Sequence, residues 1–133
     1  MNTPSREDII RIKITRAVRT LSEAEKIIEF NFANAALNRL YYSCYYAATA
    51  LLFSKDIFTK THSGVQQMTG LHFVTPGLLS TDDGRFFSEL FRSRMCSDYD
   101  DFSDPDIAMV KGFAARSKEF IKAVCTILNI KTA

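Results

Sequence analysis

The segment from Phe32 to Lys55 is apolar or aromatic on nearly every side of the helix that its composition predicts. Its middle reads AALNRLYYSCYYAATALLF. A helix without a polar face has to be covered by protein on most sides, so we expect this one at the centre of a helical bundle. Its tyrosines need hydrogen-bond partners wherever they are buried. Asn38 and Arg39 need polar partners or a groove that is open to water.

Two further long helices are predicted from apolar residues that recur in steps of three and four. The first runs from about Arg6 to Glu29. The last begins in the motif SDPD, with Asp104 as the N-cap and Pro105 in the first helical position. The two seams are Ile10, Ile14, Ala17, Leu21, Ala24 and Ile28, and Ile107, Val110, Ala114, Ser117, Ile121, Val124 and Leu128.

Between these segments the chain predicts a short helix and one more long helix. The short one spans about His62 to Phe73, with Thr61 as its N-cap. The long one spans about Thr81 to Asp98, after a Ser80–Asp83 pair that resembles a capping box. The fold class is therefore all-α: one domain over residues 1–133, an antiparallel up-and-down four-helix bundle with an additional short helix.

Composition excludes some classes of function. The formal net charge of +2 is too small to indicate nucleic-acid binding from bulk charge. Cys44, Cys96 and Cys125 are odd in number and lack metal-ligand spacing, so we interpret them as reduced thiols. No apolar run approaches the ~20 residues of a membrane span. We expect a cytoplasmic protein with no metal, cofactor or membrane contact.

The segment RSRMCSDYDD holds two arginines that the helical period places on different faces. Arg92 shares a face with polar residues and is expected at the surface. Arg94 shares a face with apolar residues, namely Phe87, Leu90 and Phe91. One interpretation is an intrahelical Arg94–Asp98 pair worth ~0.3–0.5 kcal/mol. The other is a polar cluster at the mouth of a groove, formed by Arg94, Asp98 and Tyr99 with Arg39 or Asn38 nearby.

Three segments, NRLYYSCYYAATALL, KTHSGV and RSRMCSDYDDF, occur in an order and at separations that resemble a HEPN-domain protein. The resemblance covers nearly the whole chain and is strongest to the small single-domain type that is paired with a minimal nucleotidyltransferase. It implies a HEPN-like bundle and a homodimer. It also implies a toxin–antitoxin role, in which an R-x4–6-H motif at the dimer groove cuts RNA without metal or a tyrosine beside the motif is nucleotidylated by the partner.

Arg94 matches the arginine of that motif, but the histidine is missing. Tyr99 stands where the shortest spacing would place it, and the longer spacings give Asp100 and Asp101. A phenol titrates near ~10 and is a poor acid or base at neutral pH, whereas an arginine still holds a phosphate. His62 is the remaining candidate for an imidazole. The catalytic candidates are Arg94 and Tyr99, and the ligand-binding candidates are Arg94, Asp98, Tyr99, Arg39, Asn38 and His62.

Three functions remain open at this point. The first is a HEPN-like module that binds a nucleotide or RNA and is the partner or substrate of a minimal nucleotidyltransferase. The second is a metal-independent endoribonuclease toxin with an atypical R-x4-Y motif. The third is a helical dimer without a retained site. Tyr42, Tyr45 and Tyr46 would stack bases in a wet groove or simply belong to the core. We expect a homodimer because aromatic residues such as Phe86, Phe87 and Phe91 exceed what one small bundle covers.

Overall fold

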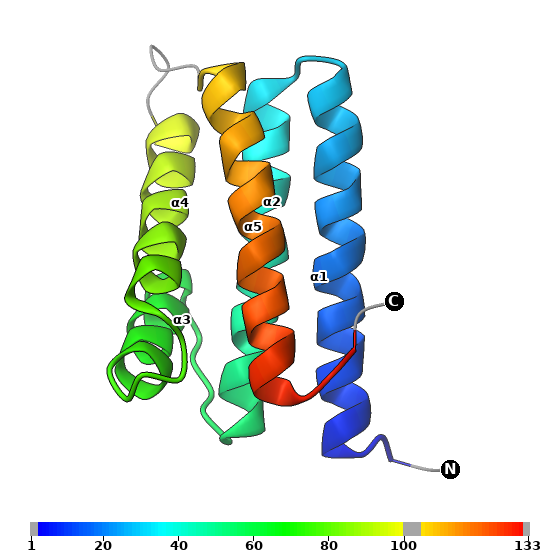
Figure 1. The fold of residues 1–133 in the computed structure, drawn as a ribbon, viewed down its shortest axis with the longest axis vertical. Helices are drawn as coiled ribbons and strands as arrows, with labels where there is room; N and C mark the ends of the chain where they lie inside the picture. The colour runs from blue at the N-terminus through cyan, green and yellow to red at the C-terminus, as the bar shows by residue number, and fades with distance from the viewer. Residues whose placement is uncertain (1–2, 100–104, 132–133) are drawn as a thin grey trace.

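The computed structural model describes residues 3–99 and 105–131, and the side chains of all of these except Asp98 and Tyr99. Its elements are α1 (Arg6–Glu29), α2 (Ala33–Ser54), α3 (His62–Thr69), the π-helix η1 (Gly70–Val74), α4 (Thr81–Tyr99) and α5 (Ile107–Leu128). Figure 1 shows the four long helices running alternately up and down, with α3 and η1 as an excursion between α2 and α4. The predicted all-α bundle is confirmed, and no strand occurs among the described residues.

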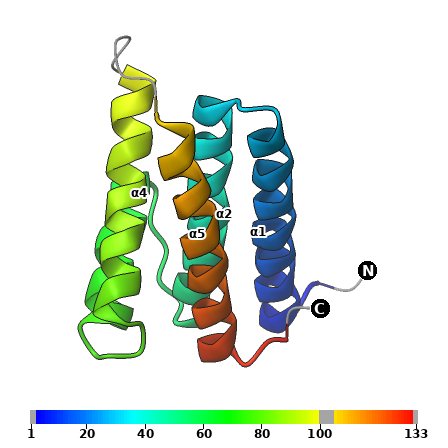
Figure 2. The same cartoon turned by 45° about the horizontal axis from the view of Figure 1, so that its top comes forward.

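Helix α2 is the central helix of the bundle, as predicted. It contacts α1, α3, α4 and α5, and α5 lies in front of it between α1 and α4 in Figures 1 and 2. Eleven of its residues are buried, against six in α1 and seven in α5. Many of these are small, including Ala47, Ala48 and Ala50, which lets the neighbouring helices approach closely. The apolar composition of this segment is therefore explained by contact with four other helices.

The helix starts follow local capping chemistry, with one correction. Asp106, not Asp104, is the N-cap of α5, because its carboxylate accepts a hydrogen bond from the Ala108 N–H at 2.9 Å. Asp104 lies outside the described residues. Pro105 therefore precedes the cap instead of opening the helix. An aspartate two residues later in SDPD offers the same capping oxygen, which is why the pattern alone did not separate the two.

Thr61 caps α3 as predicted, since its hydroxyl accepts a hydrogen bond from the Gly64 N–H at 2.9 Å. Ser80 accepts one from the Asp83 N–H at 3.0 Å and donates its own hydroxyl to the Asp83 carboxylate at 2.9 Å. This is a variant of the expected capping box, closed between the two side chains. The predicted short helix is α-helical only to Thr69 and continues as η1, whose wider turn extends to Val74.

The aromatic residues that we expected to be left uncovered are covered within the chain. Phe86 and Phe87 are only 1% and 2% exposed, and Phe91 is half-buried. The reason is that α4 turns this face onto α2 and α5, where Phe87 stacks on Phe120 at 5.3 Å between ring centres. These residues therefore give no support to the expectation of a dimer. None of the described helices combines the length and the apolar character that crossing a membrane requires.

Two glycines give a matched test of this packing. Gly112 is exposed within α5, and a Cβ there would meet no atom within 4 Å. Gly112→Ala should therefore raise the free energy of unfolding by roughly 0.5–1 kcal/mol, measured by urea denaturation. A Cβ on Gly84 would lie 2.8 Å from Val74 Cγ2. Gly84→Ala should lower stability, because overpacking against a stiff valine costs ~1–3 kcal/mol. Equal stabilisation by both variants would contradict this packing.

Candidate functional site

A cluster of polar and aromatic side chains forms where α4 and the start of α3 meet the middle of α2. We call Arg94, Tyr41, Tyr42, His62 and Arg39 the Arg94 cluster. Tyr41 is fully buried and the other four are half-buried. Tyr41 therefore anchors the cluster in the hydrophobic core, while the other four side chains are partly accessible to solvent.

Arg94 lies over the rings of two neighbouring tyrosines of α2. Its Cζ atom is 5.1 Å from the ring centre of Tyr41 and 5.3 Å from that of Tyr42, within cation–π range. Its Nη2 also makes a long hydrogen bond of 3.5 Å to the Tyr42 hydroxyl. The periodicity that places Arg94 with Phe87 and Phe91 produces this contact, because both phenylalanines pack on Tyr41 as well.

Tyr42 has a second guanidinium against it. The Cζ atom of Arg39 lies 5.2 Å from the Tyr42 ring centre, and Arg39 donates hydrogen bonds to the Asn38 side-chain oxygen at 3.1 and 3.4 Å. Asn38 and Arg39 thus reach the same place as Arg94 from the central helix. The polar partners that these two residues need are each other, the Tyr42 ring and solvent.

His62 joins the cluster from the first position of α3, directly after the Thr61 cap. Its Nδ1 lies 2.8 Å from the Tyr41 hydroxyl, and its ring stacks on Tyr45 with 4.5 Å between ring centres. The ring also lies edge-on to Tyr42 at 5.7 Å. An imidazole therefore sits in the cluster although none follows Arg94 in the sequence.

The protonation states of Tyr41 and His62 follow from their surroundings. Burial raises the pKa of Tyr41 far above its usual value, against an opposing effect of Arg94, so the phenol keeps its proton. A buried O–H needs an acceptor, and His62 Nδ1 is the one within reach. Burial, and then the charge of Arg94, lower the pKa of His62 below 6.5. At neutral pH His62 is therefore neutral, and donation from the Tyr41 hydroxyl to Nδ1 places the imidazole proton on Nε2.

The structure brings together most of the site residues predicted from the sequence. Arg94, Arg39, Asn38 and His62 all lie at or beside the Tyr41–Tyr42 pair. The side chains of Asp98 and Tyr99, like Asp100 and Asp101, lie outside the described residues, so the Arg94–Asp98 pair stays a prediction. Sequence reasoning gave no role to the Tyr41 ring. The only sequence signal for its role was its position in the central helix, one residue before Tyr42.

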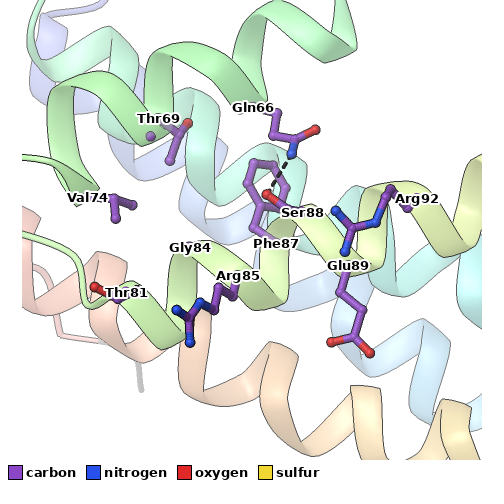
Figure 3. A pocket seen from close by; sticks show the side chains of 11 residues that line it. Gln66, Thr69, Val74, Thr81, Gly84, Arg85, Phe87, Ser88, Glu89 and Arg92 are labelled. Atoms are coloured by element: carbon purple, nitrogen blue, oxygen red, sulfur yellow. Dashed lines mark hydrogen bonds between the residues drawn. The ribbon is translucent and has the colours of Figure 1, made fainter.

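Arg92 is exposed, as predicted, but it also borders a cavity on another side of α4. This cavity of about 560 Å³ lies between α3, η1 and α4 and is lined by Gln66, Thr69, Gly70, Val74, Thr81, Gly84, Arg85, Phe87, Ser88, Glu89 and Arg92. In Figure 3 the Gln66 amide donates to the Ser88 hydroxyl, at 2.6 Å, across the gap between α3 and α4. Its residues do not include those of the Arg94 cluster.

The donor atoms of the Arg94 cluster are guanidinium, phenol and imidazole groups, which suit an anion better than a metal ion. Within the described part of the chain, no three His, Cys, Asp or Glu side chains come together as metal ligands would. What the cluster offers chemically is two arginine forks, a neutral imidazole N–H and tyrosine rings.

The environment of His62 predicts its titration. By NMR, its imidazole should titrate below pH 6.5, and Arg94→Ala should raise that pKa part of the way because burial remains. Arg92→Ala, on another face of α4, should leave it unchanged. Because the unfolded chain binds the proton first as pH falls, the contribution of this group to stability is complete above 6.5. It is lost as pH falls from 6.5 toward the folded-state pKa. A His62 pKa above 6.5 would contradict the described contacts.

Comparison with known proteins shows which family this chain belongs to. The family model described as HEPN domain matches residues 10–131. A UPF0332 protein of Thermotoga maritima is 29% identical over 119 residues, which cover 90% of this chain and 90% of that protein. A protein of Methanocaldococcus jannaschii named "Putative toxin MJ0605" is 34% identical over 99 residues, covering 74% of this chain and 73% of that protein. Since the family model spans nearly all of the chain, this protein belongs to the HEPN domain family.

Proposed function

We propose that this protein is a HEPN module of the toxin type whose Arg94 cluster binds a phosphate group of RNA or of a nucleotide. The observation that supports this most is the placement of two guanidiniums, Arg39 and Arg94, on one tyrosine ring at 5.2 and 5.3 Å. Arginine presents a planar fork of donors that matches phosphate oxygens, and two such forks on one tyrosine ring bring positive charge together at one place.

The described contacts favour binding over cleavage. Cutting RNA without metal needs one group that takes the 2′-hydroxyl proton and another that protonates the leaving oxygen. In the tautomer that accepts from Tyr41 at Nδ1, the Nε2 atom of His62 carries the proton and has no lone pair with which to act as a base. The Tyr41 phenol is a very weak acid because burial raises its pKa. A neutral N–H beside a guanidinium hydrogen-bonds a phosphate well and is poorly prepared to cut one.

Substitution of Arg94 tests the binding role. Arg94→Ala should weaken binding of a fluorescein-labelled RNA octamer by roughly tenfold to a hundredfold, since a hydrogen bond to a charged group contributes ~1.5–3 kcal/mol. Fluorescence anisotropy measures the change. Thermal unfolding of the variant should remain cooperative.

Arg92→Ala is the control, because Arg92 is exposed on another face of the same helix. It should change the affinity by less than about threefold. Equal and negligible effects of both changes would mean that Arg94 only stabilises α4.

A second candidate function is a metal-independent endoribonuclease. The observation that favours it is the imidazole of His62 in the Arg94 cluster, because this supplies the group that the R-x4-Y motif lacks. The opposite tautomer, with Nδ1–H donating to the Tyr41 oxygen, would free Nε2 to act as a base.

Incubation of the protein with labelled RNA in EDTA separates the two candidates. We expect little or no cleavage by the unmodified protein between pH 5 and 8. Cleavage that is abolished by His62→Gln and by Arg94→Ala, but retained in Arg92→Ala, would establish the endoribonuclease instead. A control lane with heat-denatured protein excludes a contaminating nuclease.

The resemblance to small HEPN proteins is the basis of two partner proposals. We propose a homodimer, and a minimal nucleotidyltransferase as the second protein of the pair, with Tyr99 as the residue that it would modify. Phe30 and Phe32 stack on each other at 6.4 Å and remain 69% and 63% exposed at the α1–α2 connection. Exposed aromatic pairs of this kind are common at protein interfaces, so this end of the bundle is a reasonable contact for either partner.

A further inference from the structure

Helix α2 is covered on every side except one. The residues of its central part that remain half-buried all fall on a single face about 120° wide, at helical spacing. We call this face the α2 strip; its members are Asn38, Arg39, Tyr42, Tyr45, Tyr46, Thr49 and Phe53. From Arg39 to Phe53 it extends about 21 Å along the helix, far beyond the Arg94 cluster at one end.

Cations border the α2 strip along its whole length. Arg39 and Arg94 lie on Tyr42 at one end, as described above. Farther along, the Cζ atom of Arg16 is 5.3 Å from the Tyr46 ring centre, and Lys13 Nζ is 5.8 Å from that of Phe53. Arg16 and Lys13 both come from α1, on the opposite side of the strip from His62. Three helices, α1, α2 and α4, thus contribute positive groups to one row of aromatic rings.

Three of these cations, Lys13, Arg16 and Arg39, make no ion pair within the part of the chain that the structure describes. Among the described residues, no carboxylate lies within 4.0 Å of Lys13, Arg16 or Arg39, since the ion pairs there involve other residues. Lys13 and Arg16 stand one helical turn apart, and burial followed by the charge of Arg16 lowers the pKa of Lys13. Holding like charges together costs free energy, which an anion bound along the strip would relieve.

We propose that the α2 strip is the path of a single-stranded RNA, with Lys13 and Arg16 as a second phosphate contact and Tyr46 as a stacking surface for a base. A positively charged groove lined with aromatic rings is how proteins bind single strands without sequence preference. A length of about 21 Å corresponds to a footprint of roughly four nucleotides, at the short end of such sites. This inference rests on the proposed binding role of the Arg94 cluster and extends it to α1.

The charges also favour RNA over a second copy of the chain as the occupant. In a symmetric dimer formed through the α2 strip, each row of cations would face the same row of its partner. Like charges in such an arrangement repel, and no described carboxylate lies within 4.0 Å of Lys13, Arg16 or Arg39 to offset the repulsion. A polyanion meets no such repulsion.

The salt dependence of RNA binding tests whether the α2 strip is the path of the RNA. Anisotropy of a labelled uridine octamer, measured between 50 and 300 mM NaCl, gives the slope of log affinity against log salt concentration. Lys13→Gln and Arg16→Gln should each reduce the magnitude of that slope by about 0.7, the value for one phosphate contact on a single strand. Each should also weaken binding several-fold at low salt. Tyr46→Leu should weaken it about tenfold.

Two exposed arginines of α1, the helix that carries Lys13 and Arg16, provide matched controls. Arg11 and Arg19 line a hollow beside Ile130 and Lys131, away from the α2 strip. Arg11→Gln and Arg19→Gln change the net charge equally and should leave the slope unchanged. A uridine dinucleotide, too short to reach both ends, should bind the Arg16→Gln variant as it binds the unmodified protein.

The outcomes separate this inference from the function on which it rests. If Arg94→Ala weakens binding while Lys13→Gln and Arg16→Gln behave like the controls, the α2 strip is not the path and the proposed function stands. If the unmodified protein binds no octamer, the proposed function fails first. If the strip variants instead convert a dimer to a monomer in light scattering, the strip is an interface between copies and the inference is overturned.

Discussion

The rest of the structure depends on the contacts that the buried side chain of Tyr41 makes. This residue is fully buried in the core, where its ring stacks on Phe87 and packs on Phe91. Its hydroxyl fixes His62, and its ring supports the guanidinium of Arg94. The same side chain therefore fastens α4 and α3 to α2 and sets the relative positions of the two groups most able to bind a phosphate. Because the core holds it rigidly, the Arg94 cluster is preorganised without a ligand.

This arrangement explains how one helix is both the core and the site. Several of the small residues of α2 are fully buried and allow close packing, while all of its aromatic residues except Tyr41 are half-buried. The helical period spreads the four tyrosines in these six positions over an arc of about 140°, with Tyr41 at one edge and Tyr46 at the other. Tyr41 enters the core, and Tyr42, Tyr45 and Tyr46 remain half-buried, each in contact with a cation or an imidazole.

The fold was largely predictable, because the periods of apolar residues identify each long helix and the composition of α2 identifies the centre. The site was predictable only in part. The helical face of Arg94 followed from its spacing to Phe87 and Phe91, and so did its separation from Arg92. The contact of His62 with Tyr41 spans 21 positions and a loop between two helices, so no local pattern reports it. The cover over Phe86 and Phe87 depends in the same way on how α4 docks, and counting aromatic residues did not predict it.

The tautomer of His62 decides between the two chemical roles that the cluster allows. A histidine that acts as a base needs a lone pair facing the substrate and a partner that accepts from its other nitrogen. Tyr41 is the reverse of such a partner, because a buried phenol with a raised pKa keeps its proton and donates it to Nδ1. Replacing the phenol by a carboxylate would invert the tautomer, but the charge would then be buried in an aromatic core. The core that holds the imidazole in place thus also favours the tautomer that donates from Nε2, which is the one suited to the proposed phosphate contact.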